Sequence, residues 1–322
     1  MKSSYAAGKH GIFLFLLFSI PHICIMRIAH FILVHKDPVA VERLIKTLQH
    51  ENFDFYIHVD KKANIKDYLF LGKLPNVSFI KKRIDVIWAG YTLTKAMLVP
   101  MEEIIATGIQ YDFINHLSGQ DYPLKSPQYI NDFFEGQKGK SFIYSFNPDE
   151  DPVFWKDHMF RITRWHMTNY RFRGRFRVEN LLNKIFPHRK FPLPYTVYGG
   201  ASGYWTISYE CAKYVIDFMA AHPEVERFGK FMWGSDEVII PTIVMNSPLK
   251  DTVVRDHCRY IYFPKGEANP KILTTDDFDT LKNSGKLFAR KFDRKKDGRI
   301  LDMLDELINQ ESKQNLLEKQ TI

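Results

Sequence analysis

Apolar, strand-like runs alternate with helical patterns along the first third of the chain, and this alternation limits the fold more than any other feature. Residues 28–34 and 53–59 are rich in β-branched and aromatic residues, as expected for strands buried on both faces of a sheet. Helical patterns follow at residues 38–50 and 92–108. Because strand–helix–strand units build parallel sheets, the sequence predicts an α/β fold with a mostly parallel, Rossmann-like sheet flanked by helices.

The rest of the chain continues this pattern without an internal repeat or a low-complexity linker. We predict strands at residues 76–82, 85–90 and 111–119, a glycine-rich turn followed by a strand within residues 198–208, and helices at residues 209–222, 233–247, 274–285 and 299–319. Ser208 and Ser235 are the predicted N-caps of two of these helices, and Pro241 predicts a kink or an early end of the second one. The pattern favours a single domain over residues 26–295, followed by an amphipathic C-terminal helix in residues 296–322.

An apolar run at residues 11–25, within an N-terminal segment of residues 1–25, precedes the first predicted strand. It is shorter than the roughly 20 residues that a helix needs to cross a bilayer, and Pro21 interrupts it. Three interpretations of this segment stay open: a signal-anchor, a cleaved signal peptide and translated upstream sequence. We favour Met26 as the functional start of the protein. Three widely spaced cysteines form neither a disulfide framework nor a zinc motif. We therefore expect a protein that is cytoplasmic or associated with the cytoplasmic face of a membrane.

The formal charge of +8 indicates an anionic partner, and basic residues are concentrated in residues 161–190 and 286–299. In the first of these segments, arginines alternate with Trp165, Phe172 and Phe176. That pattern fits docking on an acidic membrane surface, binding of an anionic glycan acceptor, or a solvated loop and helix. The chain carries no recognisable nucleic-acid-binding motif, and carboxylates at strand ends would repel phosphates. We therefore expect no nucleic-acid partner.

Polar side chains follow three of the predicted strands. His35, Asp60 and Asp121 lie at or just beyond the carboxyl ends of these strands. In open α/β sheets ligands bind beyond these ends, so the three residues predict a shared site. Asp60 fits two roles, an acceptor of hydrogen bonds from a ribose or base and a turn residue that caps the following helix.

Carboxylates also open the helix predicted over residues 233–247, where Asp236 and Glu237 stand side by side. The helix dipole favours acidic residues at this position, so a structural role competes with a role in proton transfer. Two D-x-D patterns, at residues 149–151 and 277–279, lie in an acidic loop and in the first turn of a predicted helix. Carboxylates need no metal to explain them there, and we predict no metal ligands.

Two adjacent cations, Arg290 and Lys291, stand between Phe288 and Phe292 near the end of the predicted domain. If the flanking aromatic residues are buried, the direction of both cations is fixed. Fixed cations suit the neutralisation of a diphosphate, whereas a basic surface strip is the alternative.

Seven segments stand in the order and spacing of one known family. They are FILVHK, YIHVD, VIWAGYTLTKAML, FINHLSGQDYPL, GGASGYWTIS, SDEVIIPTI and LFARKFD, and the resemblance runs from about residue 27 to residue 292. The chain resembles the core-2/I-branching glycosyltransferase family, which includes β1,6-N-acetylglucosaminyltransferases and peptide O-xylosyltransferases. A short chain without disulfides favours a bacterial member. The resemblance implies a GT-A type fold, a UDP-sugar donor, a glycan acceptor, inversion at the anomeric carbon, and no required metal or other cofactor.

The resemblance also implies roles for individual residues. Glu237 would be the catalytic base, and Lys271 and Lys291 would offset the charge on departing UDP, beside the Arg290 singled out above. The other residues grouped with the site are Val34, His35, Asp60, Trp88 and Asp121 for the UDP-sugar, and Trp205, Trp233 and Asp236 for the acceptor side of the cleft. N-acetylglucosamine is the predicted sugar, with xylose as the alternative. A non-catalytic glycan- or nucleic-acid-binding protein is the alternative from another class.

Overall fold

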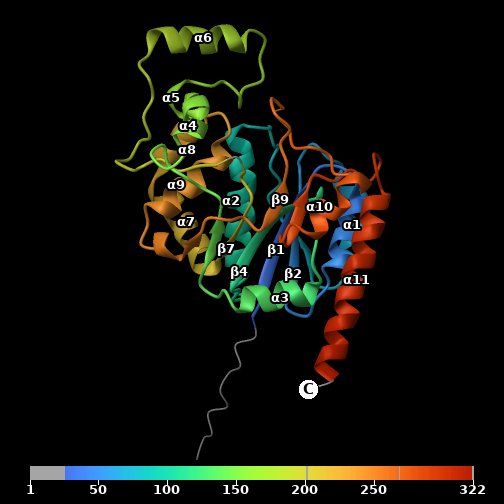
Figure 1. Cartoon of the computed structure of the whole chain (residues 1–322). Helices are drawn as coiled ribbons and strands as arrows, with labels where there is room; N and C mark the ends of the chain where they lie inside the picture. The colour runs from blue at the N-terminus through green and yellow to red at the C-terminus, as the bar shows by residue number, and fades with distance from the viewer. Residues whose placement is uncertain (1–25, 201, 268, 321–322) are drawn as a thin grey trace, which may run out of the picture.

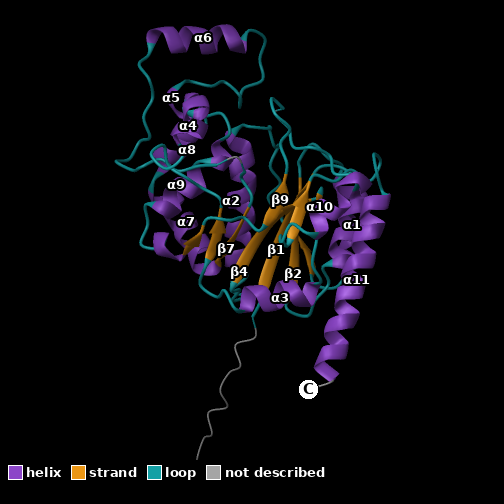
Figure 2. Ribbon diagram, viewed as in Figure 1, coloured by secondary structure: helices purple, strands orange, loops and turns teal. Residues whose placement is uncertain are grey.

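A seven-stranded sheet forms the centre of the computed structural model, which describes residues 26–200, 202–267 and 269–320 (Figure 2). Its strand order is β3-β2-β1-β4-β7-β6-β8. The strands are β1 (Ile28–Val34), β2 (Phe53–Val59), β3 (Val77–Phe79), β4 (Phe113–Ser118), β6 (Ser141–Ile143), β7 (Trp205–Ser208) and β8 (Val253–Val254). The strands β1 to β4 are parallel, and only β7 runs antiparallel to its neighbours. The predicted α/β class with a mostly parallel sheet is confirmed.

A second, three-stranded sheet joins distant parts of the chain. It consists of β5 (Asp121–Pro123), β10 (Phe288–Arg290) and β9 (Arg259–Ile261), with β10 in the middle. The antiparallel register of β10 and β5 places Arg290 directly opposite Asp121. This pairing brings a cation from the C-terminal part of the domain to the end of β4.

Helices cover both faces of the central sheet (Figure 1). They are α1 (Pro38–Thr47), α2 (Tyr91–Ala106), α3 (Pro127–Glu135), α4 (Pro152–His158), α5 (Phe160–Thr163), α6 (Arg175–Ile185), α7 (Tyr209–Ala221), α8 (Pro223–Gly229), α9 (Ile239–Met245), α10 (Phe278–Lys282) and α11 (Arg299–Gln320). In the part of the chain that the structure describes, no helix has both the length and the apolarity needed to cross a bilayer. The apolar N-terminal segment predicted at residues 11–25 lies outside that part.

The buried strand β1 divides the core into two layers. Ile28 and Ile32 face a cluster that includes residues of α1 and α11, whereas Ala29 and Phe31 face a cluster that includes residues of α2, α7 and α9. Successive side chains of a strand point to opposite faces, so a continuous apolar run is what a strand covered on both sides requires.

Of the two predicted N-caps, Ser208 is confirmed and Ser235 is wrong, because α9 begins after Val238 and no side chain caps it. Ser208 accepts a hydrogen bond from the backbone N–H of Cys211 at 3.1 Å, as predicted for the start of α7. Thr274 and Asp277 form a capping box before α10, in the segment predicted to be a short capped helix. The terminal helix is present as α11, and its Asp305 pairs with Arg43 of α1 at 2.6 Å.

Two predictions of secondary structure are wrong. Residues 85–90 form a loop and not a strand, because they pair with no other strand of the sheet. The helix predicted from Ser235 begins only at Ile239, and residues Ser235–Glu237 form a separate 3-10 turn. Pro241 consequently lies in the first turn of α9, where a missing N–H breaks no intrahelical hydrogen bond, so it kinks nothing.

Candidate active site

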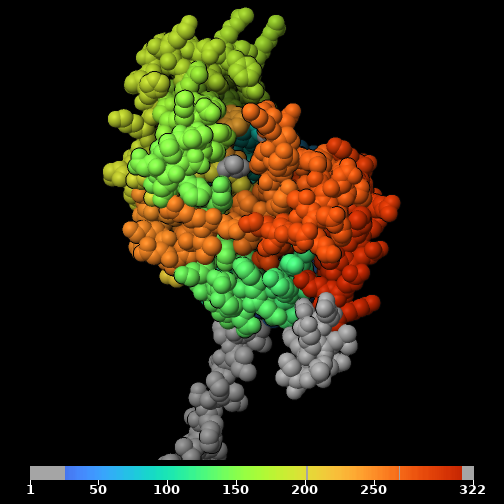
Figure 3. Space-filling model, in the orientation of Figure 1, coloured from blue at the N-terminus to red at the C-terminus, as the bar shows by residue number. Residues whose placement is uncertain are grey.

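A cleft of about 900 Å³ opens above the carboxyl ends of β1, β2 and β4. The surface of the molecule is hollowed here, between the green and the orange segments in Figure 3. The predicted site residues that line the cleft are Val34, His35, Asp60, Trp88, Trp233, Asp236, Glu237, Arg290 and Lys291. Asp121, Lys271 and Trp205 are not among the described residues that line it. The structure therefore gathers most of the predicted site into one cleft.

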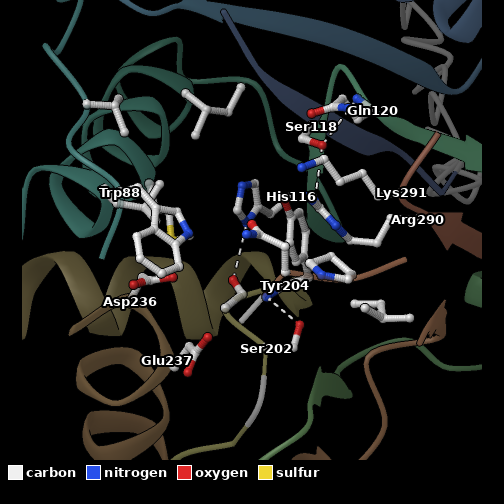
Figure 4. A pocket seen from close by; sticks show the side chains of 18 of the residues that line it. Trp88, His116, Ser118, Gln120, Ser202, Tyr204, Asp236, Glu237, Arg290 and Lys291 are labelled. Carbon is white, nitrogen blue, oxygen red and sulfur yellow. Dashed lines mark hydrogen bonds between the residues drawn. The ribbon is translucent and has the colours of Figure 1, made fainter. Parts of the chain in front are cut away.

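Opposite charges face each other across this cleft. Figure 4 shows the carboxylates of Asp236 and Glu237 on one side and the cations of Arg290 and Lys291 on the other, with Tyr204 between them. This arrangement provides a proton acceptor and an anion-binding group around the same space.

The two carboxylates lie on a 3-10 turn, Ser235–Glu237. The hydroxyl groups of Ser235 and Thr94 are 2.7 Å apart, which ties the turn to α2. The backbone N–H of Gly234 donates to the carbonyl of Ala89 at 2.7 Å, and Gly234 has the positive φ of 67° that favours glycine. The position of the turn is therefore fixed from two sides.

A glycine-rich segment lets the backbone approach this turn. A Cβ atom added at Gly203 would lie 2.7 Å from Oδ2 of Asp236, and one added at Gly199 would lie 3.0 Å from the carbonyl oxygen of Glu237. Real Cβ contacts are essentially never shorter than 3.0 Å, so a side chain at position 203 would displace the Asp236 carboxylate. The glycines of the segment GGASG thus let the backbone pack closely against the turn that carries the two carboxylates.

Arg161 of α5 is the direct partner of Glu237. Its guanidinium donates a hydrogen bond to Oε2 of Glu237 and lies 4.6 Å from the ring centroid of Trp233. The Arg161 side chain is 9% exposed and that of Glu237 is 21% exposed, so the pair is largely removed from water. Arg161 was not among the predicted site residues, because nothing in its local sequence separates it from the other arginines of residues 161–190.

Burial controls the protonation of the two carboxyl groups. Burial, followed by the charge of the neighbouring Glu237, raises the pKa of Asp236 to about 7. Burial also raises the pKa of Glu237, while the charge of Arg161 opposes that rise. A carboxylate with a pKa raised toward neutrality is a stronger proton acceptor than a solvent-exposed one.

Arg290 is fixed by three partners on the opposite wall. Its guanidinium donates to Oδ1 of Asp121 at 3.0 Å and to Oγ of Ser118 at 3.1 Å, and it lies 4.2 Å from the ring centroid of Tyr204. Asp121 also accepts from the backbone N–H of Ser118 at 2.9 Å, and its side chain is fully buried. The carboxylate predicted to lie near the donor sugar or ribose therefore stands behind Arg290 and orients it.

Tyr204 belongs to an aromatic stack beneath the cleft. Its ring stacks on His116 at a centroid distance of 4.8 Å, and His116 stacks on Phe31 at 4.5 Å. Burial and the charge of Arg259 hold the pKa of His116 well below its usual value, so this ring is neutral. Trp205, predicted to face the acceptor, packs against the same stack in the core and is 1% exposed.

Lys291 follows Arg290 and also lines the cleft. Burial and the charge of Arg290 lower its pKa. The nearby carboxylate of Asp293 pairs with Lys36 at 2.9 Å instead. Lys271, the other predicted cation, pairs with Asp277 at 2.7 Å and does not line the cleft, although its neighbours Asn269 and Pro270 do.

Asp60 is a turn residue at the edge of the cleft, and Asn64 caps the following 3-10 helix, Ile65–Asp67, in its place. Its carboxylate accepts from the backbone N–H of Lys62 at 2.9 Å and from the Lys62 ammonium at 3.0 Å, as a turn residue does. It also lines the cleft, together with Lys62. The Lys62 ammonium bridges further to Asp85 at 2.9 Å, which connects the turn to the loop that carries Trp88.

Aromatic side chains from distant segments form one wall of the cleft. Trp88 and Trp233 meet edge to face with ring centroids 5.5 Å apart, and Phe160 lies 6.1 Å from Trp233. Phe154 and His158 stack at 4.0 Å. Trp88 is 59% exposed, so a large apolar face is available to a ligand.

The D-x-D patterns have structural roles outside the cleft. Asp151 caps α4 through the backbone N–H of Phe154 at 2.9 Å, and Glu150 pairs with Arg255 at 2.7 Å. Asp277 belongs to the capping box before α10. Over residues 26–200, 202–267 and 269–320, no three His, Cys, Asp or Glu side chains gather in a way that would hold a metal ion.

Comparisons with known proteins identify the family. The family model of the Core-2/I-Branching enzyme matches residues 28–282. Xylosyltransferase 2 of Rattus norvegicus is 26% identical over 308 residues, which are 87% of this chain and 33% of that protein. Xylosyltransferase oxt of Drosophila pseudoobscura pseudoobscura is 34% identical over 109 residues, 32% of this chain and 12% of that protein. The chain thus spans at most about a third of the length of these relatives.

Among solved structures, mouse xyloside xylosyltransferase 1 in its apo form matches with a TM-score of 0.34 and 11% identity, over 70% of this chain and 83% of that one. A similarity of this size adds nothing to the assignment. The family model covers most of the domain that carries the cleft, from β1 to α10. The chain therefore belongs to the Core-2/I-Branching enzyme family, a family of glycosyltransferases.

Proposed function

We propose that this protein transfers a sugar from a UDP-sugar to a hydroxyl group of a glycan acceptor, with inversion at the anomeric carbon. The proposal is carried by one observation, the placement of the Asp236 and Glu237 carboxylates opposite the Arg290 and Lys291 cations in a single cleft. The position of that cleft at the carboxyl ends of parallel strands is the usual position of a nucleotide site in an α/β sheet.

In the proposed reaction, Glu237 is the general base. It takes the proton of the acceptor hydroxyl while that oxygen forms a bond to the anomeric carbon. The bond from the anomeric carbon to the diphosphate breaks on the opposite side, and UDP leaves with the electron pair. The raised pKa of Glu237 favours this step, and the hydrogen bond from Arg161 orients the carboxylate.

Arg290 and Lys291 are proposed to stabilise the charge that develops on the departing diphosphate. The contacts of Arg290 with Asp121, Ser118 and Tyr204 fix its direction before the substrate binds. Charged groups that are already oriented need no rearrangement during the reaction, which is why they stabilise a transition state effectively. We propose that these cations replace a divalent metal.

The donor sugar is open between two candidates. N-acetylglucosamine is the sugar predicted from the resemblance to the family. The names of the xylosyltransferases reported above favour xylose. The acceptor side is proposed to be the aromatic surface of Trp233 and Phe160, next to the carboxylates, while Trp88 is kept for the UDP-sugar.

A donor panel tests the proposal. The purified protein is incubated with UDP-xylose, UDP-N-acetylglucosamine, UDP-glucose and GDP-mannose, and release of the nucleoside diphosphate is measured. We expect release from UDP-xylose or UDP-N-acetylglucosamine and none from GDP-mannose. If calorimetry detects no binding of UDP at all, the proposed function is wrong. Binding of UDP without turnover of any UDP-sugar, with and without oligosaccharide acceptors, would favour the non-catalytic alternative.

A further inference from the structure

The basic segment over residues 164–190, called here the α6 segment, forms one end of the molecule, and the helix α6 lies at its tip (Figure 1). The segment contains eight Arg or Lys residues and one acidic residue, Glu179. It therefore carries +7 of the formal charge of +8 of the whole chain. So strong a concentration of one sign attracts an anionic partner.

The inner side of α6 is attached by polar contacts. Glu179 accepts a hydrogen bond from the backbone N–H of Met167 at 2.8 Å. The side-chain amide of Asn183 accepts from the N–H of Trp165 at 2.9 Å and donates to its carbonyl oxygen at 2.8 Å. Trp165 itself is covered by the guanidinium of Arg189, 4.8 Å from its ring centroid. The helix α6 is thus attached through polar side chains to the residues that precede it, Trp165 and Met167.

The apolar side of α6 faces outward instead. Val178, Leu181 and Ile185 are three and four positions apart, a spacing that puts them in one stripe along the helix. Leu181 is 55% exposed and Ile185 is 64% exposed. Phe176 is 62% exposed and Phe186 is 49% exposed. A helix on the surface of a globular protein normally turns such a stripe toward the core, so this stripe requires a partner.

Basic residues border the exposed stripe. Arg177 and Lys184 are exposed on α6, and Arg173 is exposed just before it. The one acidic residue of the segment, Glu179, is partly buried on the inner side. An apolar stripe that is bordered by cations and free of anions matches the interface of an anionic bilayer, where apolar side chains enter the acyl boundary and cations meet the headgroups. We propose that the α6 segment docks the protein on an anionic lipid surface.

This surface lies at the same end of the molecule as the cleft. Arg171 of the α6 segment pairs at 3.3 Å with Asp85, in the loop that carries Trp88. Asn169 donates at 2.6 Å to the carbonyl of Lys230, close in sequence to Trp233. The start of β1 lies at the opposite end of the sheet from α6 (Figure 1). On the proposed function, docking through α6 would bring the cleft near an acceptor held at the membrane.

Vesicle binding of the full-length protein tests the docking. Sedimentation is measured with vesicles of phosphatidylcholine alone and with vesicles that contain about one third phosphatidylglycerol. One variant replaces apolar residues, Leu181→Asn with Ile185→Asn, and a second replaces cations, Arg173→Gln, Arg177→Gln and Lys184→Gln. Since all these side chains are exposed, both variants are expected to keep the melting temperature of the wild type.

A matched control removes similar exposed side chains elsewhere, with Leu69→Asn, Lys66→Gln and Lys73→Gln. The apolar residues 11–25 are common to every variant, so differences between variants report on the substituted surface alone.

We expect the wild type and the control to bind anionic vesicles, more weakly as salt is raised, and to bind neutral vesicles poorly. Each α6 variant should lose binding to anionic vesicles by about tenfold or more.

Equal binding of the wild type and both α6 variants would overturn the proposal. So would a wild-type dimer in sedimentation velocity that the Leu181→Asn and Ile185→Asn variant dissociates, because the stripe would then be covered by a second copy. UDP release is measured without vesicles, so a failure of the docking proposal would not affect the proposed function. Likewise, vesicle sedimentation needs no catalysis, so a failure of the proposed function would not affect the docking proposal.

Discussion

The guanidinium of Arg161 donates a hydrogen bond to the carboxylate of Glu237, although 76 positions separate the two residues in sequence. Both side chains are mostly buried, and the indole of Trp233 covers the guanidinium. A buried arginine keeps its charge, so it holds the neighbouring Glu237 toward its ionised form while burial acts in the other direction. This contact is therefore expected to set the pH at which the proposed base works.

Replacing Arg161 should move the pH profile of transfer. In Arg161→Gln the charge that lowers the pKa of Glu237 is lost, so this pKa should rise further. Glu237 then accepts a proton only at higher pH, so kcat/KM should fall by about tenfold or more at pH 7 and recover in alkaline buffer. Arg161→Lys keeps a cation and is the matched control. If kcat/KM of Arg161→Gln decreases toward acidic pH at the same pH as that of the wild type, Arg161 does not tune the pKa of Glu237.

Asp236→Asn should stabilise the protein in a pH-dependent manner. Because the pKa of Asp236 is raised from 3.8 to about 7, the folded protein binds more protons than the unfolded chain between these values. The ionised carboxylate therefore costs stability above pH 7, a cost that decreases as the pH falls through 7 and disappears near pH 4. The variant should gain on the order of 2 to 4 kcal/mol above pH 7.

Thermal melting between pH 4 and pH 8.5 checks this prediction. The exposed Asp217, replaced in Asp217→Asn, is the control and should show no comparable gain at high pH. A constant difference between Asp236→Asn and the wild type over the whole range would mean that Asp236 keeps an ordinary pKa.

Tyr204 should matter for nucleotide binding through Arg290. The ring lies 4.2 Å from the Arg290 guanidinium, and Tyr204→Leu removes this contact while those with Asp121 and Ser118 remain, so Arg290 is held less firmly. We expect the Kd for UDP to rise by about fivefold to twentyfold, because part of the electrostatic orientation is lost. Tyr204→Phe retains the ring face and should bind UDP like the wild type. Calorimetry that finds equal Kd values for Tyr204→Leu and Tyr204→Phe would remove Tyr204 from the positioning of Arg290.

The part of the fold that the sequence predicted rests on local patterns. The runs that became β1, β2 and β4 are continuous and apolar because helices cover both faces of the sheet. The N-cap Ser208 and the capping box at Thr274 depend on residues within three positions, so the sequence carries the whole signal. The loop at residues 85–90 was wrongly predicted to be a strand, because a short apolar run shows no hydrophobic periodicity that would distinguish a strand from a loop.

The contacts that shape the site were not predictable from local patterns. Asp121 and Arg290 are 169 positions apart and meet only because β5 and β10 pair, so Asp121 was assigned to the ligand itself. Arg161 had no distinguishing neighbour among the arginines of its segment, and its role is visible only where α5 meets the turn at Glu237. Tyr204 stands inside the segment GGASGYWTIS, and its aromatic ring beside several glycines was the one signal that could have been followed.

The most direct test of the account is UDP release in the presence of EDTA, measured for the wild type and Glu237→Gln with UDP-xylose and UDP-N-acetylglucosamine. The glutamine keeps an oxygen that can accept the hydrogen bond from Arg161, but it cannot take a proton. We predict that the wild type releases UDP in EDTA, and that Glu237→Gln loses about 10² to 10⁴-fold in rate while its Kd for UDP is unchanged. Release that appears only after manganese is added, or a Glu237→Gln variant as active as the wild type, would contradict the account.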